Sequence, residues 1–373
     1  MLKDLSQTLI GCRVKAAREA GELTQDQLAQ QLGLNDRQSV SDLENGKRAL
    51  KPTELLTLAE LFNRDIEYFL DPLAVTGEAH FSWRAAHEVS PASLNGFEQE
   101  AGQLIGLLRW LRAQQKSPTS ALKPTLRLSA HSSYELAQDS AESLVDELEL
   151  GVIPAINLID HIERKLDIPV LFIDINVSDM DGDVSGATCH LDQMSAILIN
   201  RQESDARRVF DLAHELFHAL TWDAMKPAHR ESNSIEPRGK RKRTEQLADN
   251  FAAALLMPKK SLDKLLNRDR LKDSDYLRDV AGQLQVAPMT LAWRLFNLKM
   301  IDEATRTTLS QHKQPSNQLT LPKPYSPTFV HMLHEALVNG RISARKASKV
   351  MRKGLDQMLK LFAEYDLPAP FDL

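Results

Sequence analysis

The feature that most constrains this chain is a pair of histidines, His214 and His218, with Glu215 directly after the first. Residues 204–220 carry apolar side chains at three- and four-residue spacing, which predicts one helix. Four residues are little more than one helical turn, so both imidazoles point the same way and can reach one cation. The apolar opposite face predicts a helix that packs in a core while the histidines face a cleft. The alternative interpretation is a pair of ordinary histidines on a helix.

A second helix is predicted over residues 244–256, where Glu245 precedes an apolar stripe. Glu245 is the candidate third ligand, and a His, His, Glu set leaves a fourth position for water, as in catalytic rather than structural zinc sites. Asp249, one turn further on, is the candidate acceptor for the outer ring N–H of a ligand histidine. Glu215 is the candidate general base that takes a proton from the attacking water. The alternative for Glu245 is a solvated acid favoured by the helix dipole.

The two helices resemble those of the ImmA/IrrE family of metallopeptidase-like proteins. The likeness is strongest in residues 210–220 (FDLAHELFHAL) and 245–258 (EQLADNFAAALLMP), and it extends to residues 197–200, 280–286 and 294–295. It implies a zinc-dependent endopeptidase of the gluzincin type, with Mn²⁺ as a second candidate for the metal. The substrates of such proteins are usually transcription repressors.

The first 72 residues predict an all-helical module of five helices. Residues 24–33 form a capped helix that ends in Gly, and residues 36–45 form a second helix, the layout in which the second helix enters a major groove. The candidate contacts to base edges and phosphates are Arg37, Gln38, Ser39, Ser41, Lys47 and Arg48.

This module resembles the Xre-type helix-turn-helix family in residues 10–13 (IGCR), 23–25 (LTQ), 28–29 (LA) and 40–48 (VSDLENGKR). The resemblance implies a double-stranded DNA operator as partner and a homodimer that binds paired half-sites. The alternative is a helical bundle used only for dimerisation or protein binding. Residues 1–72 carry more acidic than basic side chains, so non-specific DNA affinity should be weak and strongly dependent on salt.

The length of 373 residues and the ordinary globular composition predict more than one domain. We expect a mostly helical α+β protein: a DNA-binding domain over 1–72, a helical linker over 73–130, a metallopeptidase domain with a small antiparallel sheet over 131–262, and a helical region over 263–373. The last region includes a helix-turn-helix-like pair over 275–297 and a basic helix around 341–360. Trp83 and Arg84 fall in the linker, where packing against a neighbouring domain is expected.

The two cysteines are too few for a disulfide framework, and the N-terminus lacks the apolar segment of a signal peptide. No apolar run is long enough to span a bilayer, and the net charge of −5 gives no global basic field. We therefore expect a cytoplasmic protein without a membrane partner.

Two functions from different classes fit these features. The first is a DNA-binding transcription regulator with a zinc endopeptidase that cleaves a repressor, an antitoxin or itself in response to a signal. The alternative is a repressor or antitoxin-like protein whose metallopeptidase fold is a non-catalytic sensing or dimerisation body. The basic residues 238–243 between the metal helices are interpreted as a solvated loop, with a lid or a DNA contact as alternatives.

Overall fold

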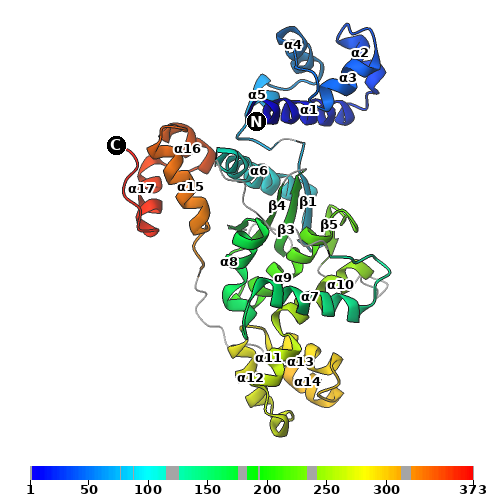
Figure 1. Cartoon of the computed structure of the whole chain (residues 1–373), viewed down its shortest axis with the longest axis vertical. Coiled ribbons are helices and arrows are strands. Elements are labelled where there is room, and N and C mark those ends of the chain that lie inside the picture. The colour runs from blue at the N-terminus through cyan, green and yellow to red at the C-terminus, as the bar shows by residue number, and fades with distance from the viewer. Residues whose placement is uncertain are drawn as a thin grey trace. The chain divides into compact units, whose positions relative to one another are not determined.

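Two compact units make up the chain, and each draws on segments that are not consecutive in sequence (Figure 1). The computed structural model describes residues 2–75, 77–86, 88–114, 126–174, 183–191, 194–232, 242–311 and 321–372. Unit 1 combines Met1–His80, Asn95–Pro118 and Pro327–Leu373, and unit 2 combines Phe81–Leu94 and Thr119–Ser326. The domain boundaries expected after residues 72, 130 and 262 stay predictions.

The N-terminal part of unit 1 contains the five helices expected from the sequence. They are α1 (Leu2–Ala20), α2 (Gln25–Gln31), α3 (Arg37–Glu44), α4 (Pro52–Leu61) and α5 (Ile66–Leu70). Thr24 and Gln27 form a capping box at the start of α2, and the Asp36 side chain accepts the Ser39 N–H at the start of α3. These caps fix where both helices begin. Apolar side chains from all five helices form one buried cluster that holds α2 and α3 together.

The rest of unit 1 comes from α6 (Pro91–Gln114), from residue 95 onward, and from three C-terminal helices, α15 (Pro327–Val338), α16 (Ala344–Met351) and α17 (Leu355–Glu364). The single basic helix expected around 341–360 is wrong, because Arg352 has a left-handed backbone with φ of 50° and ends α16. Gly354 then starts α17, with the Gln357 side chain accepting the Gly354 N–H. Two of the basic side chains form ion pairs inside the unit, Lys346 with Asp71 and Arg352 with Glu100.

A five-stranded sheet in the order β2-β4-β3-β1-β5 lies at the centre of unit 2. Its strands are β1 (His80–Ala85), β2 (Val170–Ile173), β3 (Val184–Leu191), β4 (Met194–Asn200) and β5 (Arg230–Ser232). The antiparallel arrangement expected from sequence holds for β3 and β4, but β2 runs parallel to β4 and β1 parallel to β5, so the sheet is mixed. The β3–β4 hairpin reverses the chain, and β4 therefore returns alongside β2 in the same direction.

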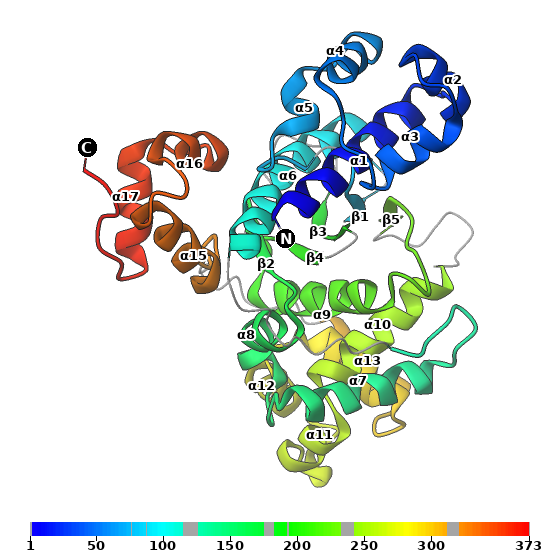
Figure 2. The ribbon, with the colours of Figure 1, turned by 45° about the horizontal axis from the view of Figure 1, so that its top comes forward.

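Eight α-helices and a 3-10 helix over Arg268–Arg270, all among the described residues, complete unit 2. The α-helices are α7 (Tyr134–Leu148), α8 (Pro154–Leu166), α9 (Asp205–Thr221), α10 (Arg243–Leu256), α11 (Lys259–Leu265), α12 (Ser274–Gln283), α13 (Pro288–Asn297) and α14 (Glu303–Gln311). The helix α9 packs against β3, β4 and α10, and α10 also packs against α7 (Figure 2). The two helices predicted to carry metal ligands are confirmed as α9 and α10. Among the described residues, no helix has the length and apolar character that crossing a bilayer demands.

Candidate metal centre

Three buried side chains converge between α9 and α10. His214 and His218 come from α9, and Glu245 comes from the first turn of α10. The two histidine Nε2 atoms lie 3.2 Å apart. Glu245 Oε2 lies 3.3 Å from His214 Nε2, and Glu245 Oε1 lies 3.2 Å from His218 Nε2. The three side chains thus form a candidate metal site.

Glu245 approaches His214 with Oε2 and His218 with Oε1, and each separation has the size expected between two ligand atoms of one zinc ion. Bonds of about 2.0–2.1 Å at tetrahedral angles put neighbouring ligand atoms about 3.3 Å apart. Within the described part of the chain, neither carboxylate oxygen of Glu245 has a partner with hydrogen-bond geometry. A buried carboxylate without donors is costly, and a cation at the centre of the three ligands removes that cost. The donor set of two imidazoles and one carboxylate therefore suits zinc, and its carboxylate also suits manganese.

Without a metal, this cluster strongly favours a positive charge. Burial and the charge of Arg84 act to lower the pKa of His214, but contacts with Asp249 and Glu245 outweigh them and raise it to about 9. Burial acts to raise the pKa of Glu245, but the two histidines lower it well below its usual range. A proton or a metal ion can supply the charge that the cluster favours.

Asp249 contacts the outer nitrogen of His214. Its Oδ1 lies 3.0 Å from His214 Nδ1. When His214 Nδ1 donates this hydrogen bond, the ring is neutral, and the lone pair of Nε2 is free to bind a cation placed between the three side chains. The role of Asp249 beside a bound metal stays a prediction.

Glu215 points toward strand β3 and is buried. Its Oε2 lies 2.8 Å from the hydroxyl oxygen of Thr188 on β3. Burial raises the pKa of Glu215, and the charges of His218 and His214 and the Thr188 hydrogen bond oppose that rise only in part. Thr188 was not predicted, because a threonine in a strand carries no signal of such a contact.

Gly186 lets β3 approach Glu215 and β4 closely. A Cβ atom at this position would lie 2.6 Å from the Leu198 carbonyl oxygen and 3.7 Å from Glu215 Cγ. Because the first contact is with backbone, a side chain at position 186 would force the two strands apart.

Arg84 is a second residue whose contacts were not predicted from sequence. It lies on β1 and forms an ion pair with Asp211 of α9. Its NH2 atom lies 3.8 Å from Asp249 Oδ1, and its guanidinium carbon lies 5.8 Å from the centroid of the Phe210 ring. The expectation that Trp83 packs is consistent with its position, since it is fully buried and stacks on Phe81.

Comparisons with known proteins agree with this arrangement. Residues 14–69 match a helix-turn-helix family model, and residues 163–296 match the model of the IrrE N-terminal-like domain, a peptidase family. The chain carries an Xre-type helix-turn-helix domain and an IrrE N-terminal-like domain. All three candidate ligands lie inside the second match.

The comparison with curated proteins gives no significant match. The apo form of the competence regulator ComR from Streptococcus vestibularis is a solved structure that aligns with 97% of this chain and 99% of its own, at 11% identity and a TM-score of 0.17. A likeness this weak carries no argument about fold or function.

In the helix-turn-helix domain, the predicted DNA contacts lie on or just after α3 and differ in their surroundings. Arg37 and Gln38 are exposed, and they bond to Gln25 and Asp42 respectively. Lys47 is exposed, whereas Ser39 and Ser41 are half-buried. Arg48 is also half-buried, with NH1 lying 3.1 Å from both carboxylate oxygens of the buried Glu54. DNA contact by any of these residues stays a prediction.

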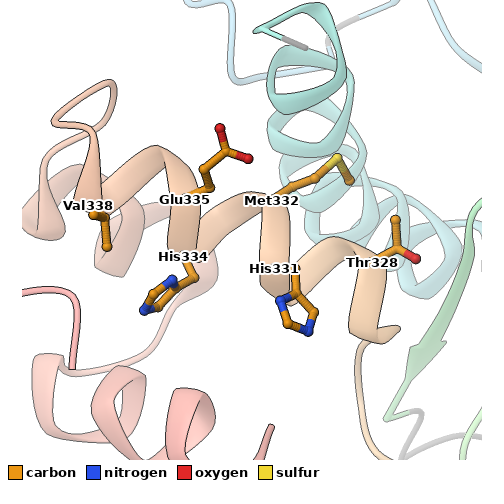
Figure 3. A pocket seen from close by; sticks show the side chains of 6 residues that line it. All are labelled: Thr328, His331, Met332, His334, Glu335 and Val338. Atoms are coloured by element: carbon orange, nitrogen blue, oxygen red, sulfur yellow. The ribbon is translucent and has the colours of Figure 1, made fainter. Parts of the chain in front are cut away.

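Two further features do not add to the metal centre. Residues 238–241 of the basic loop lie outside the described residues, while Arg243 lies over the Tyr134 ring at 3.9 Å. A pocket on α15 contains His331, His334 and Glu335 (Figure 3). The two histidines point to one side of the helix and Glu335 to the other, so these groups do not converge on one ion.

Proposed function

We propose that this protein is a DNA-binding transcription regulator with a zinc-dependent endopeptidase, which cleaves a repressor, an antitoxin or the chain itself in response to a signal. The observation that carries the proposal is the buried set of His214, His218 and Glu245, with ligand atoms 3.2–3.3 Å apart. The IrrE N-terminal-like match supports peptidase chemistry, and the helix-turn-helix match supports DNA binding.

Each residue of the centre has a separate role in this proposal. His214, His218 and Glu245 hold the metal, and Asp249 fixes the ring of His214 through Nδ1. A bound zinc ion supplies Lewis acidity toward water and a peptide carbonyl. Glu215 takes a proton from the attacking water and returns it to the leaving amine. Its buried position and raised pKa suit a group that both accepts and donates a proton.

The helix-turn-helix domain is proposed to bind a double-stranded operator as a homodimer, with α3 in the major groove. Arg37, Gln38, Ser39, Ser41, Lys47 and Arg48 are the proposed contacts. Of these, Arg37, Gln38 and Lys47 are the exposed ones. Arg48 would have to leave the buried Glu54 to contact DNA, whereas Arg37, Gln38 and Lys47 already face solvent.

Elemental analysis of the full chain tests the metal site, and an intact-mass time course of the same samples tests cleavage. We expect about one zinc per chain in the wild type and in Glu215→Gln, and none in Glu245→Ala. Glu303→Ala is the matched control, because Glu303 is an exposed acid in the first turn of α14. Zinc should stay bound in this control.

The cleavage test uses the chain alone and mixtures with candidate repressor or antitoxin proteins. Fragments should form with the wild type and the control, and not with Glu215→Gln. A Glu215→Gln protein that still cuts would remove Glu215 as the base. A wild type that holds no metal would favour the non-catalytic sensing or dimerisation body.

A further inference from the structure

Arg84 bridges the two helices that carry the metal ligands. It forms an ion pair with Asp211, which lies one turn before His214 on α9. It also faces Asp249, which lies one turn after Glu245 on α10, at 3.8 Å. One guanidinium group therefore contacts a carboxylate from each helix.

We propose that Arg84 is a positioning residue of the metal centre, acting through Asp249 on His214. The inference rests on the proposed metal binding by His214, His218 and Glu245. The oxygen that faces Arg84, Asp249 Oδ1, is the same atom that lies 3.0 Å from His214 Nδ1. A shift of Arg84 therefore moves the acceptor that orients a ligand ring.

The surroundings of Arg84 favour an arginine at this position, because it contacts both Asp211 and Asp249. The side chains of Arg84 and Asp211 are 11% and 2% exposed, so water contributes little to either charge. Asp211 Oδ2 accepts no hydrogen bond from the described residues, and the half-exposed Arg207 approaches it only to 3.7 Å, so Arg84 is the closer cation of the two. A planar guanidinium can address two carboxylates at once, whereas a lysine ammonium is a single point charge.

The strand that carries Arg84 is held firmly against the sheet. Trp83 is fully buried, and its N–H donates to the His229 carbonyl oxygen at 2.9 Å. The Ala86 N–H donates to the Asp183 carbonyl oxygen at 2.7 Å. Arg84 precedes the segment that matches the IrrE N-terminal-like domain, which begins at residue 163. The proposed positioning residue is thus supplied from outside the matched domain.

Zinc affinity of the full chain, measured by competition with a chromophoric chelator, tests this inference. The variants are Arg84→Lys, Arg84→Met, Asp249→Asn and the double variant Arg84→Lys with Asp249→Asn. We expect each single variant to bind zinc about 10- to 100-fold more weakly, as for other partners of metal ligands. Because both residues act through one contact, the double variant should be little weaker than Asp249→Asn. The absorption spectrum of the Co²⁺-loaded protein should change in Arg84→Lys.

Arg207→Met is the matched control. Arg207 also approaches Asp211, at 3.7 Å, but its side chain is 43% exposed. Its zinc affinity and Co²⁺ spectrum should equal those of the wild type. If Arg84→Met does not fold, the conservative Arg84→Lys variant decides.

Three outcomes overturn the inference. If Arg84→Lys has the zinc affinity and the Co²⁺ spectrum of the wild type, the inference is wrong, and the proposed function stays intact. If the fold loss of zinc affinity in the double variant equals the product of the two single losses, Arg84 does not act through Asp249. A wild type that binds no zinc would overturn the proposed function, and the inference with it.

Discussion

The hydroxyl oxygen of Thr188 lies 2.8 Å from Glu215 Oε2 and 3.0 Å from the backbone carbonyl oxygen of the same residue. A threonine hydroxyl has one hydrogen, so it donates to one of these oxygens at a time. Strand β3 in this way restricts the Glu215 side chain from a position that belongs to neither metal helix.

Replacing Thr188 by valine should slow cleavage and leave the metal in place. Valine keeps the branched shape but removes the donor to Glu215. Hydrogen bonds to charged groups contribute about 1.5–3 kcal/mol to stability. A loss of this size in the transition state would lower the cleavage rate about 10- to 100-fold. Cleavage rate and zinc content are the two measurements. Thr188→Ser keeps the hydroxyl and should retain most of the rate. A Thr188→Val protein that cuts at the wild-type rate would refute the role given to this contact.

Gly186→Ala should destabilise unit 2. The added Cβ would meet the Leu198 carbonyl oxygen at 2.6 Å, and the backbone must shift to relieve this contact. Overpacking of this kind costs about 1–3 kcal/mol in the free energy of unfolding, measured by urea denaturation. Gly282→Ala in α12 is the control, because a Cβ there meets nothing within 4 Å. The control should be as stable as the wild type or more so, since alanine favours helix.

Removal of the metal should lower the midpoint of thermal unfolding. A ligand that binds only the folded state stabilises it by about 2.7 kcal/mol at a free concentration 100 times its Kd. Scanning calorimetry with zinc and with a chelator should therefore give two different midpoints for the wild type. Glu245→Ala should give the same midpoint in both conditions. An equal zinc effect in this variant would place the metal elsewhere.

Acid should weaken unit 1 through Asp71. Burial acts to raise the pKa of this carboxyl, but hydrogen bonds from Lys346 and from the Leu73 N–H, helped by the charges of Lys346 and Arg13, lower it. A carboxyl whose folded pKa lies below its unfolded value adds stability above the unfolded pKa, and this stability is lost as the pH falls through the folded pKa. Unfolding measured from pH 6 down to about pH 2 should show a smaller loss for Asp71→Asn. Equal losses in the two proteins would contradict this role of Asp71.

The helix-turn-helix domain should lose one phosphate contact in Lys47→Ala. The affinity for a duplex of arbitrary sequence should fall, and the slope of log K against log salt should decrease by about 1. Fluorescence anisotropy at several stated salt concentrations measures both quantities. Lys260→Ala, an exposed lysine on α11 of unit 2, should leave the slope unchanged. A slope that stays the same in Lys47→Ala would exclude this contact.

The sequence predicts well what depends on neighbouring residues. The bounds of α9 and α10, the cap at Thr24 and the convergence of His214, His218 and Glu245 follow from helical spacing and end signals. Contacts between distant segments were not predictable in the same way. Arg84 and Asp211 are 127 positions apart, so no local pattern pairs them.

The same limit applies to the sheet and to the C-terminus. The strands β1 and β5 pair in parallel across a long stretch of sequence. Residues 80–85 (HFSWRA) do alternate polar and apolar side chains, but they fall in the segment interpreted as a linker, and β5 has only 3 residues. Arg352 ends α16 by adopting a positive φ, which is uncommon for a residue other than glycine. The apolar periodicity continues before and after this position, and it therefore predicted one helix where the structure has two, α16 and α17.

The place of β1 in the chain has a practical consequence for making the second unit alone. Phe81–Leu94 belongs to that unit although Asn95–Pro118, which belongs to unit 1, separates it from residues 119–326. A fragment that starts at residue 119 lacks the strand beside β3 and leaves Asp211 without Arg84. Its bare strand edge would be open to pairing with other copies and would favour aggregation. Adding residues 81–94 as a separate peptide should restore solubility by reconstituting the sheet without a peptide link.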